Sequence, residues 1–328
     1  MAADRILIAG AGALGSVFGG MLAAKGHRVA MLGRRAHLDA IARDGLKLSG
    51  LFGERVVRGI ELADDSARLS GRFGLILCTA KAYDTATVAD AVADRLDDDG
   101  VIVSIQNGLG NIEALAERFS LRRVLGAMVI FGAEIRTPGA SHVTVIAEPV
   151  AIGPAPALHG ALSTPLAERA REVAAIIAGA GIPAVSRADI TPAIWGKLLY
   201  NVALNPLGAL LGLHYGALVD DPGLRAIIND AIDEAFSVAR GVGVALPFAD
   251  AAAYRDVFYG KLIPPTYEHR PSMIADLKRR GRTEIDALNG KVVELADRLG
   301  LRAETNRMLV RLIKAAERKA RAALAEAS

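Results

Sequence analysis

Short apolar runs alternate with helix-compatible segments through the first part of the chain. Apolar runs of strand length cover residues 5–9, 28–32, 74–78 and 101–105. They contain too few polar residues for a half-exposed sheet and are typical of buried strands. Helical patterns separate them at residues 13–25 and about 85–96. Strands that alternate with helices in this way predict an α/β domain with a parallel sheet covered on both faces.

Outside these alternating strands and helices, the predicted strands are shorter and are interrupted by turns. Residues 46–60 alternate around Gly50 and Gly53 and predict a hairpin. Further short strands are expected at residues 123–131, 141–146 and 150–153.

The character of the chain changes near Asp189, after which almost no strand pattern remains. Helical patterns cover residues 190–213, 222–242, 248–259, 272–279, 284–299 and 304–324. The polar stretch between Pro183 and Pro192 suits a domain boundary. We therefore expect two domains, an α/β domain at residues 1–188 and an all-α domain at residues 189–328.

Composition excludes several classes of protein. The chain has 328 residues, 52% of them hydrophobic and 23% charged, which is globular composition. A net charge of +3 is too small an excess to indicate nucleic-acid binding. The uncharged stretch at residues 6–24 is too rich in glycine for a membrane span, and the apolar stretch at 198–213 is too short and contains two asparagines and a proline. The single cysteine, Cys78, allows no intrachain disulfide, which fits a cytoplasmic protein.

A glycine motif, Gly10-Ala11-Gly12-Ala13-Leu14-Gly15, lies between the first strand and the first helix. In this position the first glycine permits a tight turn, the second lets a pyrophosphate approach, and the third packs the helix on the strand. The helix N-terminus then stabilises the anion. We expect a dinucleotide site here, and a glycine-rich turn without a ligand is the alternative.

The end of the second strand predicts which dinucleotide binds. NAD-binding proteins place a carboxylate there for the ribose 2′-hydroxyl. This chain instead has Arg34 and Arg35, whose guanidinium groups suit the 2′-phosphate of NADP. The alternative is a solvated basic turn.

A polar stripe interrupts the apolar segment that opens the helical half. Lys197, Asn201 and Asn205 recur every fourth residue and would line one face of a helix, with a kink expected before Pro206. Burial among apolar neighbours would lower the pKa of the lysine toward a value useful for proton transfer. A nearby carboxylate would balance the amine, and Glu284 is one of several acidic candidates. Hydrogen bonding within the core, or a plain exposed face, would also explain the stripe.

These motifs together resemble those of the ketopantoate reductase (2-dehydropantoate 2-reductase) family over nearly the whole chain. The supporting stretches are the glycine motif, Thr79-Ala-Lys81-Ala-Tyr83, Gln106-Asn107-Gly-Leu-Gly110, the segment from Trp195 to Leu207, Ser272-Met273 and residues 283–290. The resemblance implies a Rossmann-type domain followed by an all-α domain like the C-terminal domain of 6-phosphogluconate dehydrogenase. It also implies NADPH-dependent reduction of 2-dehydropantoate to pantoate, a step toward pantothenate and coenzyme A.

The resemblance assigns roles to individual residues. Lys197 matches the catalytic lysine and Glu284 the active-site glutamate that orients it. Asn201 and Asn205 match asparagines that hold substrate hydroxyl groups, and Ser272 matches a serine at the substrate carboxylate. Lys81 and Asn107 match residues beside the cofactor and the reaction centre. No metal is expected, since the histidines show no metal-ligand spacing.

One stretch departs from the family pattern. His269-Arg270-Pro271 stands where the family often has Asn-x-Ser before the serine. This departure keeps a second reading open, a reductase of another 2-oxo acid or of a β-hydroxy acid. A catalytically silent NADP sensor is a third. The apolar helical half is compatible with a homodimer without requiring one.

Overall fold

The computed structural model describes residues 5–326, which form two compact units. Within these residues, the first unit comprises 5–106 and 110–191, and the second comprises 107–109 and 192–326. The chain therefore enters the second unit twice, first for the three residues Asn107–Leu109 and then from residue 192 onward.

An eight-stranded sheet forms the centre of the first unit. Its order is β12 (Ala184–Ser186), β11 (Val150–Gly153), β8 (Val124–Met128), β7 (Leu96–Ser104), β6 (Phe73–Cys78), β1 (Arg5–Ala9), β2 (Arg28–Leu32) and β5 (Glu61–Ala63). All neighbours pair in parallel except β11 with β8. The predicted α/β domain of Rossmann type is confirmed.

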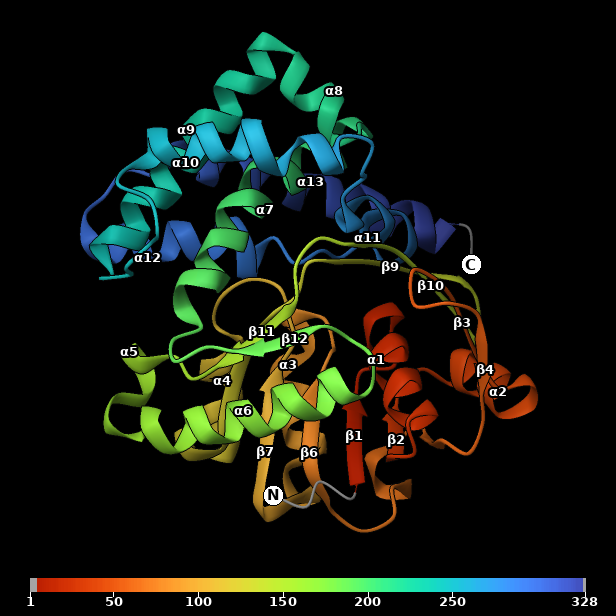
Figure 1. The fold of residues 1–328 in the computed structure, drawn as a ribbon. Coiled ribbons are helices and arrows are strands. Elements are labelled where there is room, and N and C mark those ends of the chain that lie inside the picture. Colours follow the sequence, from red (N-terminus) through yellow and green to blue (C-terminus); the bar gives the residue numbers. More distant parts are fainter. Residues whose placement is uncertain (1–4, 327–328) are drawn as a thin grey trace. The chain divides into compact units, whose positions relative to one another are not determined.

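Helices cover both faces of this sheet, so its central strands are buried throughout. They are α1 (Ala13–Ala24), α2 (Arg35–Asp44), α3 (Thr85–Ala91), α4 (Asn111–Phe119) and α6 (Ser163–Gly179). Figure 1 shows α6 in front of the sheet and α3 and α4 behind it. Every residue of β6 is buried, including Cys78, whose thiol has its pKa raised to about 12 by burial.

A four-stranded sheet packs beside α1. Its order is β4 (Arg55–Val57), β3 (Leu46–Gly50), β10 (Ala140–Ile146) and β9 (Phe131–Thr137). β3 and β4 form the expected hairpin, and β10 joins it in parallel. Leu46, Leu48 and Val143 of this sheet belong to the same hydrophobic core as α1.

Several elements of the first unit were not expected from the sequence. The helices α2, α4 and α6 and the short strands β5 and β12 were missed, and α3 ends earlier than predicted. In α6 the buried residues are Leu166, Ala170, Val173, Ala174 and Ile177. This spacing is helical, but alanine and charged residues weaken the apolar contrast on which the pattern depends. Short helical turns complete the unit at Ser66–Arg68, Ala82–Asp84, Ala93–Arg95, Leu121–Arg123, α5 (Pro156–His159) and Gly160–Leu162.

Within its described residues, 107–109 and 192–326, the second unit has helices and loops but no strands, as predicted. Its helices are α7 (Thr191–Leu211), α8 (Tyr215–Asp220), α9 (Pro222–Gly241), α10 (Ala251–Val257), α11 (Ser272–Arg280), α12 (Lys291–Leu299) and α13 (Glu304–Glu326). Shorter turns lie at Phe258–Leu262, Pro264–Thr266 and Asp286–Gly290. The helix expected over 284–299 begins only at Lys291, because a π-helical turn with non-helical Leu288 precedes it.

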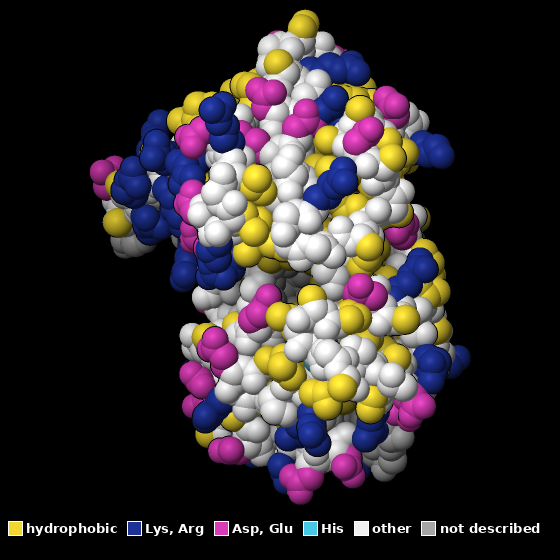
Figure 2. All heavy atoms as spheres, turned by 90° about the vertical axis from the view of Figure 1, so that its left-hand side faces the viewer, with side chains coloured by type: hydrophobic (Ala, Val, Ile, Leu, Met, Phe, Trp, Pro, Cys, Tyr) yellow, Lys and Arg dark blue, Asp and Glu magenta, His cyan; other side chains and the backbone are white. Residues whose placement is uncertain are grey.

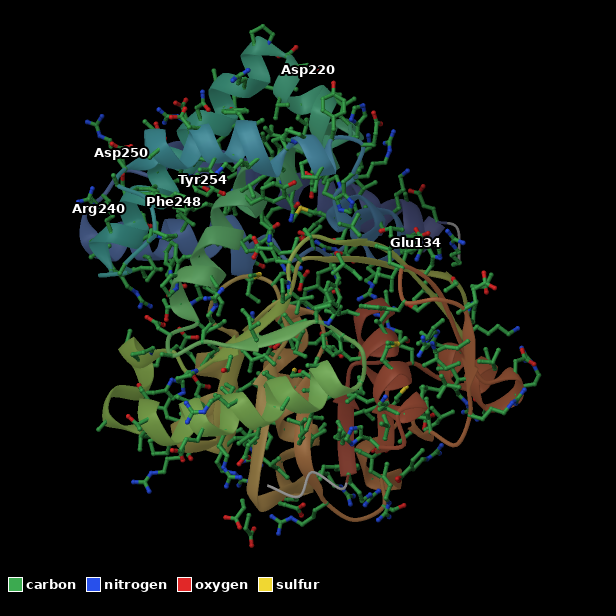
Figure 3. The ribbon with its side chains drawn as sticks, in the orientation of Figure 1. Glu134, Asp220, Arg240, Phe248, Asp250 and Tyr254 are labelled. Carbon is green, nitrogen blue, oxygen red and sulfur yellow. The ribbon has the colours of Figure 1, made fainter. Side chains whose placement is uncertain are left out.

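α7 is the central helix of this unit. It continues through Pro206, and buried residues lie on every side of it. Packing of these residues in the core outweighs the local preference of the residue before proline. Tyr254 of α10 is buried against α7, donates a hydrogen bond to the Gly196 carbonyl at 3.3 Å, and packs edge-on against Phe248 (Figure 3).

Charges of both signs occur on the face of the molecule shown in Figure 2. Lys and Arg side chains interleave with Asp and Glu side chains on the face shown in Figure 2. Within residues 5–326, no helix has the length and apolar character needed to cross a membrane.

The N-terminus of α9 offers a test of helix capping. The Asp221 carboxylate accepts a hydrogen bond from the Leu224 N–H at 2.8 Å, and Pro222 occupies the first turn. Asp221→Ala should lower the free energy of unfolding by about 1 kcal/mol, because it leaves that N–H without its acceptor. Urea denaturation measures the change. Asp230→Ala, an exposed position within the same helix, is the control, and an equal loss in both variants would contradict the capping role.

Candidate active site

The glycine motif forms the turn between β1 and α1. Gly10 has φ +121° and donates its N–H to the Leu32 carbonyl at 3.0 Å. A Cβ on Gly10 would lie 2.4 Å from the backbone nitrogen of Ala80, and one on Gly15 would lie 2.2 Å from the Gly10 carbonyl oxygen. A Cβ on Gly12 would meet nothing within 4 Å. Gly10 and Gly15 are therefore packed tightly against the protein, whereas Gly12 faces open space. Gly12 is the N-cap of α1, and no side chain caps the helix there.

The loop after β6 is held against this turn. Thr79 donates its hydroxyl to the Gly10 carbonyl at 2.7 Å, and Gln106 donates its side-chain amide to the Ala80 carbonyl at 3.1 Å. These bonds position the Thr79–Tyr83 loop, which carries the half-buried Lys81. Thr79 and Gln106 were recognised only as parts of motifs, so their supporting role comes from the structure.

The two arginines after β2 differ in their surroundings. Arg35 lies 3.9 Å from Asp39, and both side chains are exposed. Arg34 is exposed at the N-cap of α2 and makes no ion pair or side-chain hydrogen bond with another residue of the described range 5–326. A guanidinium in this position can bind an anion without first losing a protein partner.

The second unit brings an amine, an amide and a carboxylate together. Lys197 of α7 is half-buried, and its Nζ donates a hydrogen bond to Oδ1 of Asn107 at 2.5 Å. Burial lowers the pKa of Lys197 to about 8, against the opposing influence of the Glu284 carboxylate. Glu284 is itself only 6% exposed. The amine can therefore hold or release a proton near neutral pH.

Two irregular segments carry the partners of Lys197. The Leu109 N–H donates to the Ala287 carbonyl at 2.9 Å, and Gly108, at φ +84°, approaches so closely that a Cβ would lie 2.3 Å from that oxygen. Asn107 and Glu284 lie at the near ends of these two contacting segments. The close approach is what brings residues far apart in the sequence to one amine.

The segment that bears Glu284 is anchored from behind by α13. Both the N–H and the hydroxyl of Thr283 donate to Oε1 of Glu317 at 2.7 Å. Glu317 is 2% exposed and has Lys314 at 3.4 Å on its other oxygen. These bonds satisfy the Thr283 N–H and hydroxyl and fix this segment against α13.

The remaining residues of the polar stripe lie along the same helix. Asn201 and Asn205 are both buried, at 7% and 6% exposed. Asn205 accepts a hydrogen bond from the Tyr215 hydroxyl at 3.1 Å. Among residues 5–326, the Asn201 side chain has no hydrogen-bond partner.

Comparison with known proteins agrees with this arrangement. The family model described as "Ketopantoate reductase PanE/ApbA" matches residues 6–157, and the one described as its C terminal matches residues 189–317. The chain belongs to the ketopantoate reductase family.

The relatives match over nearly their full lengths. The 2-dehydropantoate 2-reductases of Aquifex aeolicus and Archaeoglobus fulgidus are 34% and 33% identical, over 95% and 97% of this chain and 97% and 99% of theirs. The solved PanE/ApbA family ketopantoate reductase from Ralstonia eutropha JMP134 is 33% identical, covers 97% of this chain and 99% of its own, and gives a TM-score of 0.83. D-mandelate dehydrogenase with NADH and anilino(oxo)acetate shares the fold at 22% identity and a TM-score of 0.86, covering 97% and 99%. These likenesses show that the chain shares its fold with ketopantoate reductases and with D-mandelate dehydrogenase.

In this member of the ketopantoate reductase family, some of the predicted site residues meet in one cluster and others lie apart from it. Lys197, Asn107 and Glu284 meet in one cluster, although Asn107 was grouped with the cofactor residues. Ser272 is exposed at the first residue of α11, and within residues 5–326 no hydrogen bond joins it to that cluster. Glu317 and Tyr215 were missed. Both look like ordinary helix residues in the sequence, and only their burial distinguishes them.

The anchoring of Thr283 can be tested by removing its acceptor. Glu317→Ala should lower the free energy of unfolding by about 2–4 kcal/mol, because it leaves two buried donors unsatisfied. Chemical denaturation measures the loss. Glu326→Ala, at an exposed position near the end of α13, should be neutral, and a Glu317→Ala variant as stable as this control would contradict the anchoring role.

Proposed function

We propose that this chain catalyses the NADPH-dependent reduction of 2-dehydropantoate to pantoate, a step toward pantothenate and coenzyme A, in the cytoplasm. The observation that carries the proposal is the amine of Lys197, bonded to Asn107 and influenced by Glu284, with its pKa lowered to about 8. The family to which the chain belongs supports the substrate. We assign dinucleotide binding to residues 1–188 and substrate binding to residues 189–328.

The chemistry follows from the charge that develops on the ketone. When bound, NADPH supplies a hydride to the carbonyl carbon. The carbonyl oxygen then gains negative charge, which the Lys197 ammonium stabilises before it transfers a proton to that oxygen. The products are an alcohol and a neutral amine. Asn107 holds Nζ in place, and the Glu284 carboxylate favours return of the proton.

The residues of the glycine turn fit a pyrophosphate. Gly12 leaves open space, and the first N–H groups of α1 have no side-chain cap. We assign Gly10, Ala11, Gly12, Ala13, Leu14 and Gly15 to this cradle and Lys81 to its border. Arg34 would hold the 2′-phosphate and so favour NADP over NAD.

The polar stripe would bind the rest of the substrate. We propose that Asn201 and Asn205 hold its hydroxyl group and that Ser272, at a helix N-terminus, holds its carboxylate. These three residues lie on the same unit as Lys197.

A second candidate function is reduction of another 2-oxo acid. In the second unit the His269 ring packs on the Tyr215 ring at 5.2 Å, Arg270 donates to the Gly212 carbonyl at 2.6 Å, and Pro271 is buried. His269 therefore presents an aromatic surface where the family often has an amide. A panel of 2-oxo acids with NADPH separates the two candidates by kcat/KM.

Lys197 should control both the rate and its pH dependence. Reduction should slow as the pH rises through about 8, because the amine loses the proton it must donate. Lys197→Ala should lower kcat by roughly 10²-fold or more and remove that pH limb, with little change in NADPH affinity. Steady-state kinetics across pH measure both effects.

Glu284→Gln refines the same test. Removing the carboxylate that raises the pKa of Lys197 should move the pH limb to lower pH. A loss below about threefold in Lys197→Ala would refute the acid role. A wild-type protein that binds NADPH but reduces none of the 2-oxo acids would instead favour the non-catalytic NADP sensor.

Arg34 should determine the cofactor preference. Arg34→Glu should raise the KM for NADPH by roughly tenfold or more and leave that for NADH nearly unchanged, since only NADPH carries the 2′-phosphate. Arg43→Glu, a charge reversal in the last turn of the same helix, is the control. Equal effects of Arg34→Glu on both cofactors would refute the assignment.

A further inference from the structure

Tyr215 contacts the polar stripe without belonging to it. This residue opens α8 and is 4% exposed. Its hydroxyl donates a hydrogen bond to Oδ1 of Asn205 at 3.1 Å. Asn205 lies two helical turns along α7 from Lys197, so the bond acts on the far end of the stripe.

The bond fixes which end of the Asn205 amide is available. A primary amide carries an acceptor oxygen and a donor nitrogen on one rotatable plane. The phenol occupies Oδ1, whereas Nδ2 has no partner among residues 5–326. Asn205 thus presents two N–H donors.

The Tyr215 side chain is itself held in place by its neighbours. The Tyr215 N–H donates to the His269 carbonyl at 3.0 Å, and the rings of Tyr200 and His269 pack on the Tyr215 ring at 5.5 Å and 5.2 Å. Burial raises the pKa of Tyr215 well above its ordinary value, so the hydroxyl keeps its proton and remains a donor. Tyr200 has its own partner, the Thr266 hydroxyl at 2.6 Å.

We propose that Tyr215 is a positioning residue that sets substrate specificity, because it holds Asn205 with its amide N–H groups turned toward the substrate. The position read by Asn205 then takes a group with an oxygen lone pair. This inference rests on the proposed function, since it requires that Asn205 contact the substrate.

The hydroxyl group of 2-dehydropantoate is the group in question. Its oxygen can accept from Nδ2, and a 2-oxo acid without it leaves a buried donor unpaired. 3,3-Dimethyl-2-oxobutanoate is the same acid without that hydroxyl and is the matched probe. The wild-type protein should prefer the hydroxylated acid in kcat/KM.

The experiment compares Tyr215→Phe with Asn205→Ala and with the double variant. Tyr215→Phe keeps the ring and removes only the donor, so KM for 2-dehydropantoate should rise roughly fivefold to tenfold with kcat nearly unchanged. Its preference over the deoxy acid should fall by the same factor. In the Asn205→Ala background the Tyr215→Phe change should have no further effect, because a positioning residue acts only through its partner.

Tyr200→Phe is the control, since it removes a neighbouring phenol that bonds to Thr266 instead. Tyr200→Phe should leave both KM and the preference unchanged. Thermal unfolding of all variants distinguishes a loss of folding from a change in the position of the Asn205 amide. Wild-type kinetics in Tyr215→Phe, or independent effects of Tyr215→Phe and Asn205→Ala, would overturn the inference and leave the proposed function intact. A folded wild-type protein that consumes NADPH with neither acid would overturn the proposed function, and the inference with it.

Discussion

The candidate site depends on an amine placed on an apolar helix. Lys197 lies next to the buried Leu198 and Leu199 of α7, where its charged form is poorly solvated. Burial alone would push the amine toward neutrality, and the Glu284 carboxylate opposes that shift, so the pKa settles at about 8. A group balanced in this way can stabilise negative charge and also give up a proton.

Segments of irregular backbone carry both residues that act on the Lys197 amine. Asn107 reaches the amine from a three-residue excursion of the chain, and Glu284 from a stretch just before a π-helical turn. The two segments meet at Gly108 and the Ala287 carbonyl, where a side chain would not fit. Glu317 of α13 accepts hydrogen bonds from both the N–H and the hydroxyl of Thr283 and so anchors the Glu284 segment. The departures from regular structure are concentrated where three distant segments must converge.

Each unit thus provides a different kind of polar surface. The first unit offers backbone N–H groups at an uncapped helix start, together with an exposed guanidinium, which suits a charged dinucleotide. The second offers buried side chains whose orientation is fixed by neighbours, as Asn107 fixes Lys197 and Tyr215 fixes Asn205. Exposed groups can adapt to an anion, but buried groups discriminate, because any donor left unpaired there costs free energy.

The sequence by itself determined the two-part architecture, the glycine turn, the basic end of β2 and the polar stripe, because each depends on local periodicity or on a motif with a local geometry. It could not single out Glu284 among the acidic residues by spacing, and it missed α6, Glu317 and Tyr215. It also expected a helix that starts at Glu284, and this expectation was wrong, since the α-helix begins only at Lys291. Only the tertiary structure decided these points, since burial and long-range contacts, such as the bond between Asn107 and Lys197, overrode what neighbouring residues prefer.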